Sequence, residues 1–286
     1  MVDTNSIQAV VAALSQSATK EYAYIPLPEQ SVPDIDGIRR LMTEVKAALF
    51  PGFFGDWNTV DHLESLYAVL SSQIRHGLGF FSKKTEQPVE EVTMAFIRQL
   101  PEIKRLLATD VKAVFDGDPA ATGYGEVIIC YPALQAMMHY RVAHELWLLK
   151  VPVLPRIITE LAHSATGIDI HPSATIGEYF SIDHGTGVVI GETCLIGNHV
   201  SLYQGVTLGA KSFTYDHRGL PMNVPRHPII EDNVVIYSNS TILGRITIGH
   251  DSIIGGNVWQ ATSVPPFSRI VQHKATAASF IDGSGI

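Results

Sequence analysis

Large aliphatic residues recur every six positions through the second half of the chain, with small or polar residues between them. The series is Ile170, Ile176 and Ile182, then, after a two-residue slip, Ile190, Ile196, Leu202 and Leu208, and, beyond an interruption, Ile230, Ile236, Ile242, Ile248 and Ile254. A β-sandwich would space its strands at roughly 8–12 residues. A period of six instead fits a solenoid of short strands that meet at tight corners and bury one column of aliphatics. The pattern therefore predicts a parallel β-helix over residues 166–266.

The residues between Gly209 and Ile229 break this repeat and combine glycine, proline and charges of both signs. They predict a loop excursion over residues 210–228 from the surface of the solenoid. Loops on rigid scaffolds often carry function. This loop returns through Arg226 and His227, which places a guanidinium and an imidazole beside the coil.

The first half of the chain has helical periodicity instead. Apolar stripes over residues 35–49, 60–74 and 89–103 predict three helices. Gly77 and Gly79 are expected to end the second helix, and Pro101 is expected to divide the third. We interpret these stripes as packing faces, either against each other or against another subunit.

Further elements connect these helices to the solenoid. Residues 1–30 are small, polar and interrupted by proline, and we interpret them as a lead-in. Residues 116–118 carry a turn signal, residues 132–149 predict a helix, and a short linking helix begins near Pro155. The predicted fold class is α+β, with an N-terminal all-α domain over residues 1–165 followed by the β-helix.

The composition is that of a globular protein, because 46% of the 286 residues are apolar and 17% are charged. A net charge of −8 without a run of Lys or Arg argues against nucleic acid as the main partner. Cys130 and Cys194 lie far apart and build no disulfide framework, which is typical of a reducing compartment. The sequence has no secretory signal pattern and no run of about 18 apolar residues. We therefore expect a cytoplasmic protein without a membrane span.

A histidine oriented by a carboxylate is the usual general base for an alcohol or amine nucleophile. His184 follows Asp183 directly, and Asp169 lies fifteen residues before His184. That separation is three residues short of a coil of three hexapeptides, so Asp169 is expected near the level above or below His184. An equally good interpretation is that Asp169 caps the turn before His171, because aspartate is common in turns.

Other chemistries are less well supported. Arg226 either holds a carboxylate with its fork of donors or is a solvated loop arginine. The sequence has no nucleophile elbow and no Walker loop, which leaves a serine hydrolase or an NTPase without support. A metal-dependent hydratase of the γ-carbonic anhydrase type, also a β-helix, needs three converging histidines. His171, His184 and His199 are spaced 13 and 15 residues apart, and we predict no metal site from them.

Several runs of residues together strongly resemble the serine O-acetyltransferases, left-handed β-helix enzymes that make O-acetylserine for cysteine synthesis. The runs are DIHPSATIG, IDHGTGVVIGET, YQGVTLGA, RHP, ILG, IGGNVW and VPP, with DPAA and ALQAMMHYRVAHELW upstream. They occur in the family's order and cover roughly residues 110–270. The left hand of the coil is implied by this resemblance alone, since crossovers between parallel strands are otherwise right-handed.

The resemblance also implies roles for single residues. His184 matches the family's general base, and Asp169 matches the carboxylate that orients it. Four further positions match contacts to the ammonium, hydroxyl and carboxylate of serine: Asp118, Asp183, Arg226 and His227. In the implied reaction His184 takes the hydroxyl proton of serine as its oxygen attacks the thioester of the co-substrate acetyl-CoA. No permanently bound cofactor is implied.

The implied acetyl-CoA site runs along a coil edge near Gly209, Ala210, Ser238 and Gly256, in a cleft between two subunits. Ala210 stands where the family commonly has the second glycine of a pair, and Ser238 belongs to a Tyr-Ser pair that replaces Gly-Ala. The N-terminal helices resemble the family's oligomerisation domain. The resemblance thus implies a homotrimer or a dimer of trimers.

The C-terminal tail, residues 267–286, ends in Gly285 and Ile286. Family members with this ending bind O-acetylserine sulfhydrylase through it, whereas a flexible linker is the alternative interpretation. Feedback inhibition by cysteine at the serine site is also implied. Besides the hydratase, two hypotheses compete with the leading one: the same fold with a different small amino-acid-like acceptor, and a non-catalytic scaffold that only docks the sulfhydrylase.

Overall fold

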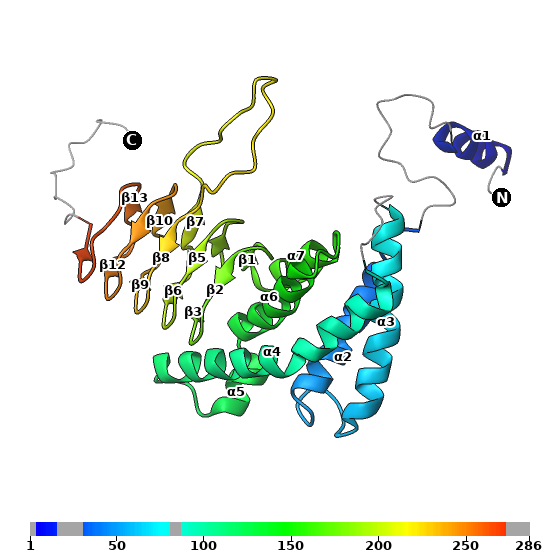
Figure 1. The fold of residues 1–286 in the computed structure, drawn as a ribbon, viewed down its shortest axis with the longest axis horizontal. Coiled ribbons are helices and arrows are strands. Elements are labelled where there is room, and N and C mark those ends of the chain that lie inside the picture. The colour runs from blue at the N-terminus through cyan, green and yellow to red at the C-terminus, as the bar shows by residue number, and fades with distance from the viewer. Residues whose placement is uncertain (1–3, 16–30, 81–86, 273–286) are drawn as a thin grey trace, which may run out of the picture.

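The structure, a computed structural model, describes residues 4–15, 31–80 and 87–272. Helices come first along the chain and short strands follow (Figure 1). The helices are α1 (Thr4–Ser15), α2 (Ile35–Leu49), α3 (Thr59–Phe80), α4 (Val89–Gly117), α5 (Tyr124–Cys130), α6 (Pro132–Leu148) and α7 (Leu154–Thr166). The strands are β1 (Asp169–Ile170), β2 (Thr175–Ile176), β3 (Ser181–Asp183), β4 (Val189–Ile190), β5 (Leu195–Ile196), β6 (Ser201–Tyr203), β7 (Thr207–Gly209), β8 (Ile229–Ile230), β9 (Val235–Ile236), β10 (Thr241–Leu243), β11 (Thr247–Ile248), β12 (Ile253–Ile254), β13 (Trp259–Gln260) and β14 (Arg269–Ile270).

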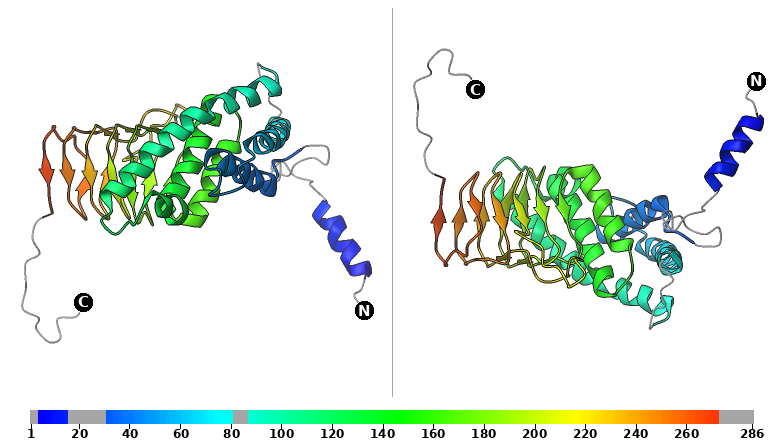
Figure 2. Two further views of the ribbon diagram at one scale, coloured as in Figure 1. Left: turned by 90° about the horizontal axis from the view of Figure 1, so that it is seen from below. Right: turned by 90° about the horizontal axis from the view of Figure 1, so that it is seen from above.

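The strands form the three parallel sheets of a solenoid, whose coils stack side by side in Figure 2. Sheet A contains β1, β4, β7, β10 and β13; sheet B contains β2, β5, β8 and β11; sheet C contains β3, β6, β9, β12 and β14. The chain passes from A to B to C and returns to A one coil further on. We call the corners at which it turns the A–B, B–C and C–A edges. The parallel β-helix predicted from the six-residue repeat is confirmed.

The repeat works because each of its aliphatic side chains points into the coil. All twelve, from Ile170 to Ile254, are at most 6% exposed. Burying one such side chain stabilises the fold by about 1.5–3 kcal/mol, so the column is a large share of the solenoid's stability.

The sheet register shows where the chain departs from a regular coil. Asp169 pairs with Val189 and Val189 with Thr207, so the first coil takes 20 residues and the second 18. Thr207 then pairs with Thr241, 34 residues further on. The difference is the arm, residues 210–228, which leaves the coil as the long yellow loop in Figure 1. Because the sheets continue in register beyond it, an insertion at a corner leaves the stack intact.

Helix α6 closes the first coil. Tyr140 and His144 each donate a hydrogen bond to a carbonyl of that coil, and Arg141 donates two. The acceptors are the carbonyls of Ala174, Pro172, Ile176 and Gly177, at 2.6–2.8 Å. Arg141 also pairs with Asp110 of α4 at 2.9 Å, and both side chains are buried. The helices and the solenoid are therefore joined by buried polar contacts as well as by packing.

Two predicted helix boundaries are wrong, and tertiary packing is the reason in both cases. Helix α3 continues through Gly77 to Phe80, because a side chain at Gly77 would meet Leu154 and Pro152 at 3.0–3.1 Å; the glycine permits close packing on α7. Helix α4 continues through Pro101. Proline removes one helical hydrogen bond, but the buried residues Leu100 and Ile103 hold the helix on both sides of it. Helices α1 and α5 were not predicted.

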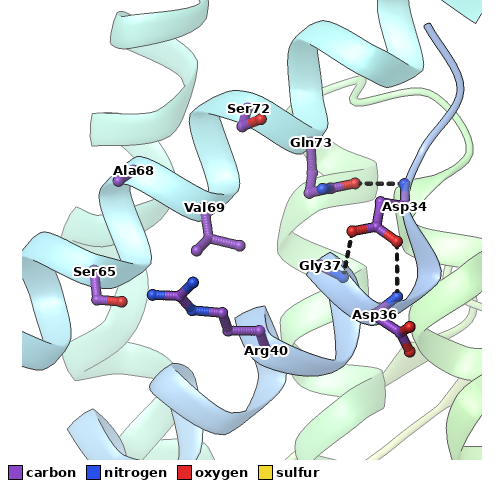
Figure 3. A pocket seen from close by; sticks show the side chains of 9 residues that line it. All are labelled: Asp34, Asp36, Gly37, Arg40, Ser65, Ala68, Val69, Ser72 and Gln73. Carbon is purple, nitrogen blue, oxygen red and sulfur yellow. Dashed lines mark hydrogen bonds between the residues drawn. The ribbon is translucent and has the colours of Figure 1, made fainter.

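A groove of about 700 Å³ lies between α2 and α3 (Figure 3). At its end Asp34 caps α2 by accepting the N–H groups of Asp36 and Gly37, and Gln73 accepts the N–H of Asp34. None of the predicted site residues within the described ranges lines this groove. Within the described ranges, no helix combines the length and the apolar character that crossing a membrane requires.

Candidate active site

The predicted site residues lie at two different edges of the solenoid. The C–A edge carries Asp183, His184, Ser238 and Gly256, and the A–B edge carries Gly209, Ala210, Arg226 and His227. Asp118 follows α4, and Asp169 begins β1. A single chain therefore presents two groups of predicted site residues.

His184 begins a corner that is two residues longer than the regular one. Its φ is +57°, and those of Gly185 and Gly187 are +91° and +81°. The N–H of Gly187 donates to the carbonyl of Gly167 at 2.9 Å, which anchors the corner to the end of α7. The imidazole is left outside the coil, with 73% of the side chain exposed. A proton acceptor that must meet a substrate from solvent needs this accessibility.

Two carboxylates lie near His184, and a phenol contacts one of them. The Oδ1 of Asp183 is 3.6 Å from the Nε2 of His184. Asp118, Tyr131 and Asp183 line one hollow, together with Tyr203 of β6. The hydroxyl of Tyr131 donates to Asp118 at 2.6 Å, and the N–H of Ala120 donates to its other oxygen at 2.8 Å. Both carboxylates thus stand where they can receive a cation.

The hydrogen bond between Tyr131 and Asp118 also sets their protonation. It is the main cause that lowers the pKa of Asp118, followed by the N–H of Ala120 and the charge of His184. The same bond raises the pKa of Tyr131 to about 12. Asp118 therefore stays a carboxylate and Tyr131 stays a donor at neutral pH.

Asp169 has different neighbours. Its Oδ1 lies 3.7 Å from Nη1 of Arg156 on α7. It also lies with Glu160 and His163 in a group of ligand-type atoms within 4.8 Å of one another. Arg156 pairs with Glu160 as well, so a side chain already supplies the cation there. The 20-residue first coil aligns Asp169 with Val189, five residues after His184 rather than three. Its orienting role stays a prediction.

Arg226 and His227 end the arm and contact a second set of residues. Nη2 of Arg226 lies 2.5 Å from Oε2 of Glu192. His227 is only 7% exposed, and burial, followed by the positive charge of Arg226, lowers the pKa of its imidazole to about 4. Nη1 of Arg245 donates to the carbonyls of Thr193 and His227 at 2.6 and 3.1 Å. This edge therefore holds its histidine buried and neutral.

The predicted acetyl-CoA residues divide between the same two edges. Gly209 ends β7, and its carbonyl accepts the N–H of Gly244 at 3.0 Å. A side chain added at Gly256 would meet the carbonyl of Ser238 at 3.3 Å, so these two residues are neighbours. Sheet A separates the two pairs. An acetyl-CoA molecule that touched all of them on one chain would have to cross this sheet.

The three histidines required by the hydratase hypothesis do not converge within the chain. His171 lies at the A–B edge, His184 at the C–A edge and His199 at the B–C edge. His199 stacks on Tyr179 with ring centroids 4.4 Å apart. The fold therefore separates the three imidazoles.

Sequence reasoning missed Tyr131, Glu192, Thr193 and Arg245. Glu192 and Thr193 belong to the run IDHGTGVVIGET and Arg245 directly follows ILG, so these runs carried the signal. Tyr131 had no comparable signal, because only the fold brings the start of α6 to the end of α4.

The chain is similar to known proteins over most of its length. The family of bacterial transferase hexapeptide proteins (six repeats) matches residues 227–259. A plasmid-encoded serine acetyltransferase of Synechococcus elongatus is 45% identical, over 98% of this chain and 95% of its own length. The crystal structure of serine acetyltransferase isoform 3 of Entamoeba histolytica, in complex with cysteine, is 32% identical with a TM-score of 0.73 and covers 96% of this chain and 93% of its own. A serine acetyltransferase in complex with CoA is 27% identical with a TM-score of 0.55, over 83% of this chain and 97% of its own.

The solenoid and these similarities define an acyltransferase of the hexapeptide-repeat class with a left-handed β-helix. Within that class, the nearly full-length similarity is to one enzyme family. The chain belongs to the serine acetyltransferases.

Proposed function

We propose that this chain transfers the acetyl group of acetyl-CoA to the hydroxyl of L-serine, giving O-acetylserine and CoA, with His184 as the general base. The observation that carries the proposal is the exposed imidazole of His184 beside the carboxylates of Asp118 and Asp183. Two carboxylates offer a site for the ammonium of an amino acid, and the imidazole offers a destination for its hydroxyl proton.

The reaction moves one proton from serine to His184 and then from His184 to CoA. Neutral His184 takes the hydroxyl proton while the serine oxygen bonds to the thioester carbon. Backbone N–H groups stabilise the resulting oxyanion. As the C–S bond breaks, His184 passes this proton to the CoA thiolate. Base catalysis of this kind contributes about 10²–10⁴-fold, and the positioning of both substrates adds more.

The division of the site between two edges supports a homotrimer in which each site combines two copies. One copy supplies Asp118, Asp183 and His184, and the neighbouring copy supplies Arg226 and His227 toward the serine carboxylate and hydroxyl. Asp169 orients His184 in this assembly. A cyclic arrangement places a C–A edge against an A–B edge three times over. A dimer of such trimers would use the N-terminal helices.

Acetyl-CoA fits the same assembly, with Ser238 and Gly256 on one copy and Gly209 and Ala210 on its neighbour. A cleft between subunits would let one pantetheine arm reach both pairs without crossing sheet A. The similarity to a serine acetyltransferase bound to CoA supports this placement.

Three further properties complete the proposal. The relative bound to cysteine supports cysteine as a feedback inhibitor at the serine site. Gly285 and Ile286 bind O-acetylserine sulfhydrylase; they lie outside the described residues, so the proposal rests on the sequence ending. The free cysteines Cys130 and Cys194 suit a cytoplasmic setting.

The test is the release of CoA thiol from acetyl-CoA with serine as acceptor. We expect serine-dependent release that falls about 10²–10⁴-fold in His184→Ala and is retained in the control His199→Ala, which alters a histidine of the B–C edge. Release that survives in His184→Ala would remove the base assignment. Release with a different amino-acid-like acceptor, but none with serine, would remove the substrate assignment.

A further inference from the structure

The tripeptide Gly191–Glu192–Thr193 lies against Arg226 and His227 at the A–B edge. Each residue of the tripeptide makes a separate contact with the pair. Together the three contacts determine how the side chains of Arg226 and His227 are positioned and which ring nitrogen of His227 carries the proton.

Gly191 makes room for the imidazole of His227. A β-carbon at this position would lie 2.0 Å from Cδ2 of His227 and 2.2 Å from Nε2. No side chain can occupy that space unless the ring moves. The absence of a side chain at Gly191 therefore allows the imidazole to lie against the coil backbone.

Glu192 holds the guanidinium of Arg226. Its Oε2 accepts from Nη2 of Arg226 at 2.5 Å, and its Oε1 accepts from Nδ2 of Asn223 at 3.1 Å. Nη1 of Arg226 donates to Asn223 and to the carbonyl of Val224 at 3.3–3.4 Å. The Nε of Arg226 is buried and has no hydrogen-bond partner in the part of the chain that the structure describes. The guanidinium is thus fixed in place while its buried Nε–H has no acceptor among the described residues.

Thr193 determines which nitrogen of His227 carries the proton. Its Oγ1 accepts the N–H groups of Arg226 and His227 at 2.9 and 3.1 Å. The hydroxyl proton is then free to point at Nδ1 of His227, 3.0 Å away. The backbone N–H of Thr193, which can only donate, also points at Nδ1 at 3.1 Å. Two donors meet at Nδ1, so this nitrogen is an acceptor and the ring proton sits on Nε2.

We infer that Gly191, Glu192 and Thr193 form a positioning unit that fixes His227 as the neutral imidazole protonated on Nε2, a hydrogen-bond donor and not a second base. The unit also holds the guanidinium of Arg226 beside the imidazole of His227. The inference rests on the proposed function for the identity of the acceptor, an oxygen of serine, but the tautomer follows from the contacts alone.

The surroundings keep the ring neutral. The charged and titratable groups that face His227 are Arg226, Glu192, His171 and Arg245. Burial is the main cause that lowers the pKa of His227, and the two permanent cations among the four groups, Arg226 and Arg245, add to it. The two histidines of the proposed site therefore have opposite tasks: His184 accepts a proton, and His227 donates a hydrogen bond through a proton that it keeps.

The tautomer can be measured without substrate, from ¹⁵N-labelled histidine spectra of the full chain. The His227 signals are identified by their loss in His227→Gln. We expect an Nε2-protonated, neutral ring at pH 6. A ring that is protonated on Nδ1, or on both nitrogens, would overturn the inference. Because this readout needs no reaction, it is independent of a failure of the serine assignment.

The role of Thr193 is tested by paired substitutions. Thr193→Val removes the hydroxyl at nearly constant volume, so His227 loses a hydrogen bond that holds its imidazole. We expect the serine KM to rise about tenfold with a smaller change in kcat. Thr193→Ser restores the hydroxyl and should return KM to within about twofold of the parent. Thr175→Val makes the same change at an exposed position of β2 and is the control. Equal KM values in the Val and Ser variants would refute the positioning role.

Discussion

The C–A and A–B edges are built from the same repeat, yet they treat their histidines in opposite ways. At the C–A edge two extra residues and three positive φ angles leave His184 in solvent. At the A–B edge His227 is buried and held by side chains of neighbouring coils. A repeat protein thus adapts one corner by changing its length and another by changing what packs on it. The first solution suits proton exchange, and the second suits fixed geometry.

The largest effect tests whether the two edges work in one site. Co-expression of His184→Ala with Arg226→Ala, each nearly inactive alone, should restore activity to about a quarter of the parent. In a random mixture, about one site in four combines the intact C–A edge of an Arg226→Ala copy with the intact A–B edge of a His184→Ala copy. Thiol release by the purified mixture is the readout. Co-expression of His184→Ala with Asp183→Ala is the control and should restore nothing, since both changes affect the same edge. Equal results from the two mixtures would mean that a site does not combine two copies.

The next effect compares glycines of the two edges. Gly191→Ala should lower kcat/KM for serine by about 100-fold, because the imidazole of His227 must move and small misplacements are costly. Gly185→Ala should mainly destabilise the fold, by about 1–2 kcal/mol, because of its positive φ. The added β-carbon would also meet Cδ1 of the buried Ile168 at 2.4 Å and Cγ2 of Ile182 at 3.1 Å. Steady-state kinetics and denaturant unfolding separate the two outcomes, and an unchanged kcat/KM in Gly191→Ala would contradict the comparison.

A smaller effect is expected at the carboxylates beside His184. Tyr131→Phe removes the hydrogen bond to Asp118, so the serine KM should rise about tenfold while kcat changes less. Tyr124→Phe is the control, because Tyr124 packs on Phe115 in the same region. A fall in kcat without a change in KM would show that Tyr131 acts on the chemical step instead.

The smallest effect concerns stability and pH. The pKa values of His227 and His139 are lowered by burial to about 4, below the value of about 6.5 in an unfolded chain. The unfolded state therefore binds more protons between pH 6.5 and 4, and stability falls as pH drops through that window. Each histidine should contribute about 2 kcal/mol of loss between pH 7 and 5. Denaturant unfolding at several pH values should show a shallower slope for His227→Gln, and an unchanged slope would argue against a buried neutral ring.

The sequence was sufficient for the solenoid because its repeat is a local signal. The aliphatics from Ile170 onward predicted the coils. The slip before Ile190 is the two-residue extension of the first coil, which the expected position of Asp169 did not take into account. Pro101 and Gly77 were misleading because packing outside their own helices decides the outcome.

The site was harder to predict than the fold, because residue types do not reveal which edge a side chain occupies. Arg226 and His184 are both in recognisable runs, but their separation on one chain follows only from counting coils through the arm. The contact of Tyr131 with Asp118 joins two helices and has no periodic signature.

The hydrogen bonds from α6 to the first coil also decide how the solenoid can end. A stack of parallel strands presents an unpaired edge that can template the addition of another chain. Tyr140, Arg141 and His144 occupy the carbonyls that such a chain would need. End-to-end growth into a filament is thereby blocked at this end, so the enzyme keeps a finite length while its coils remain open to insertion at their corners.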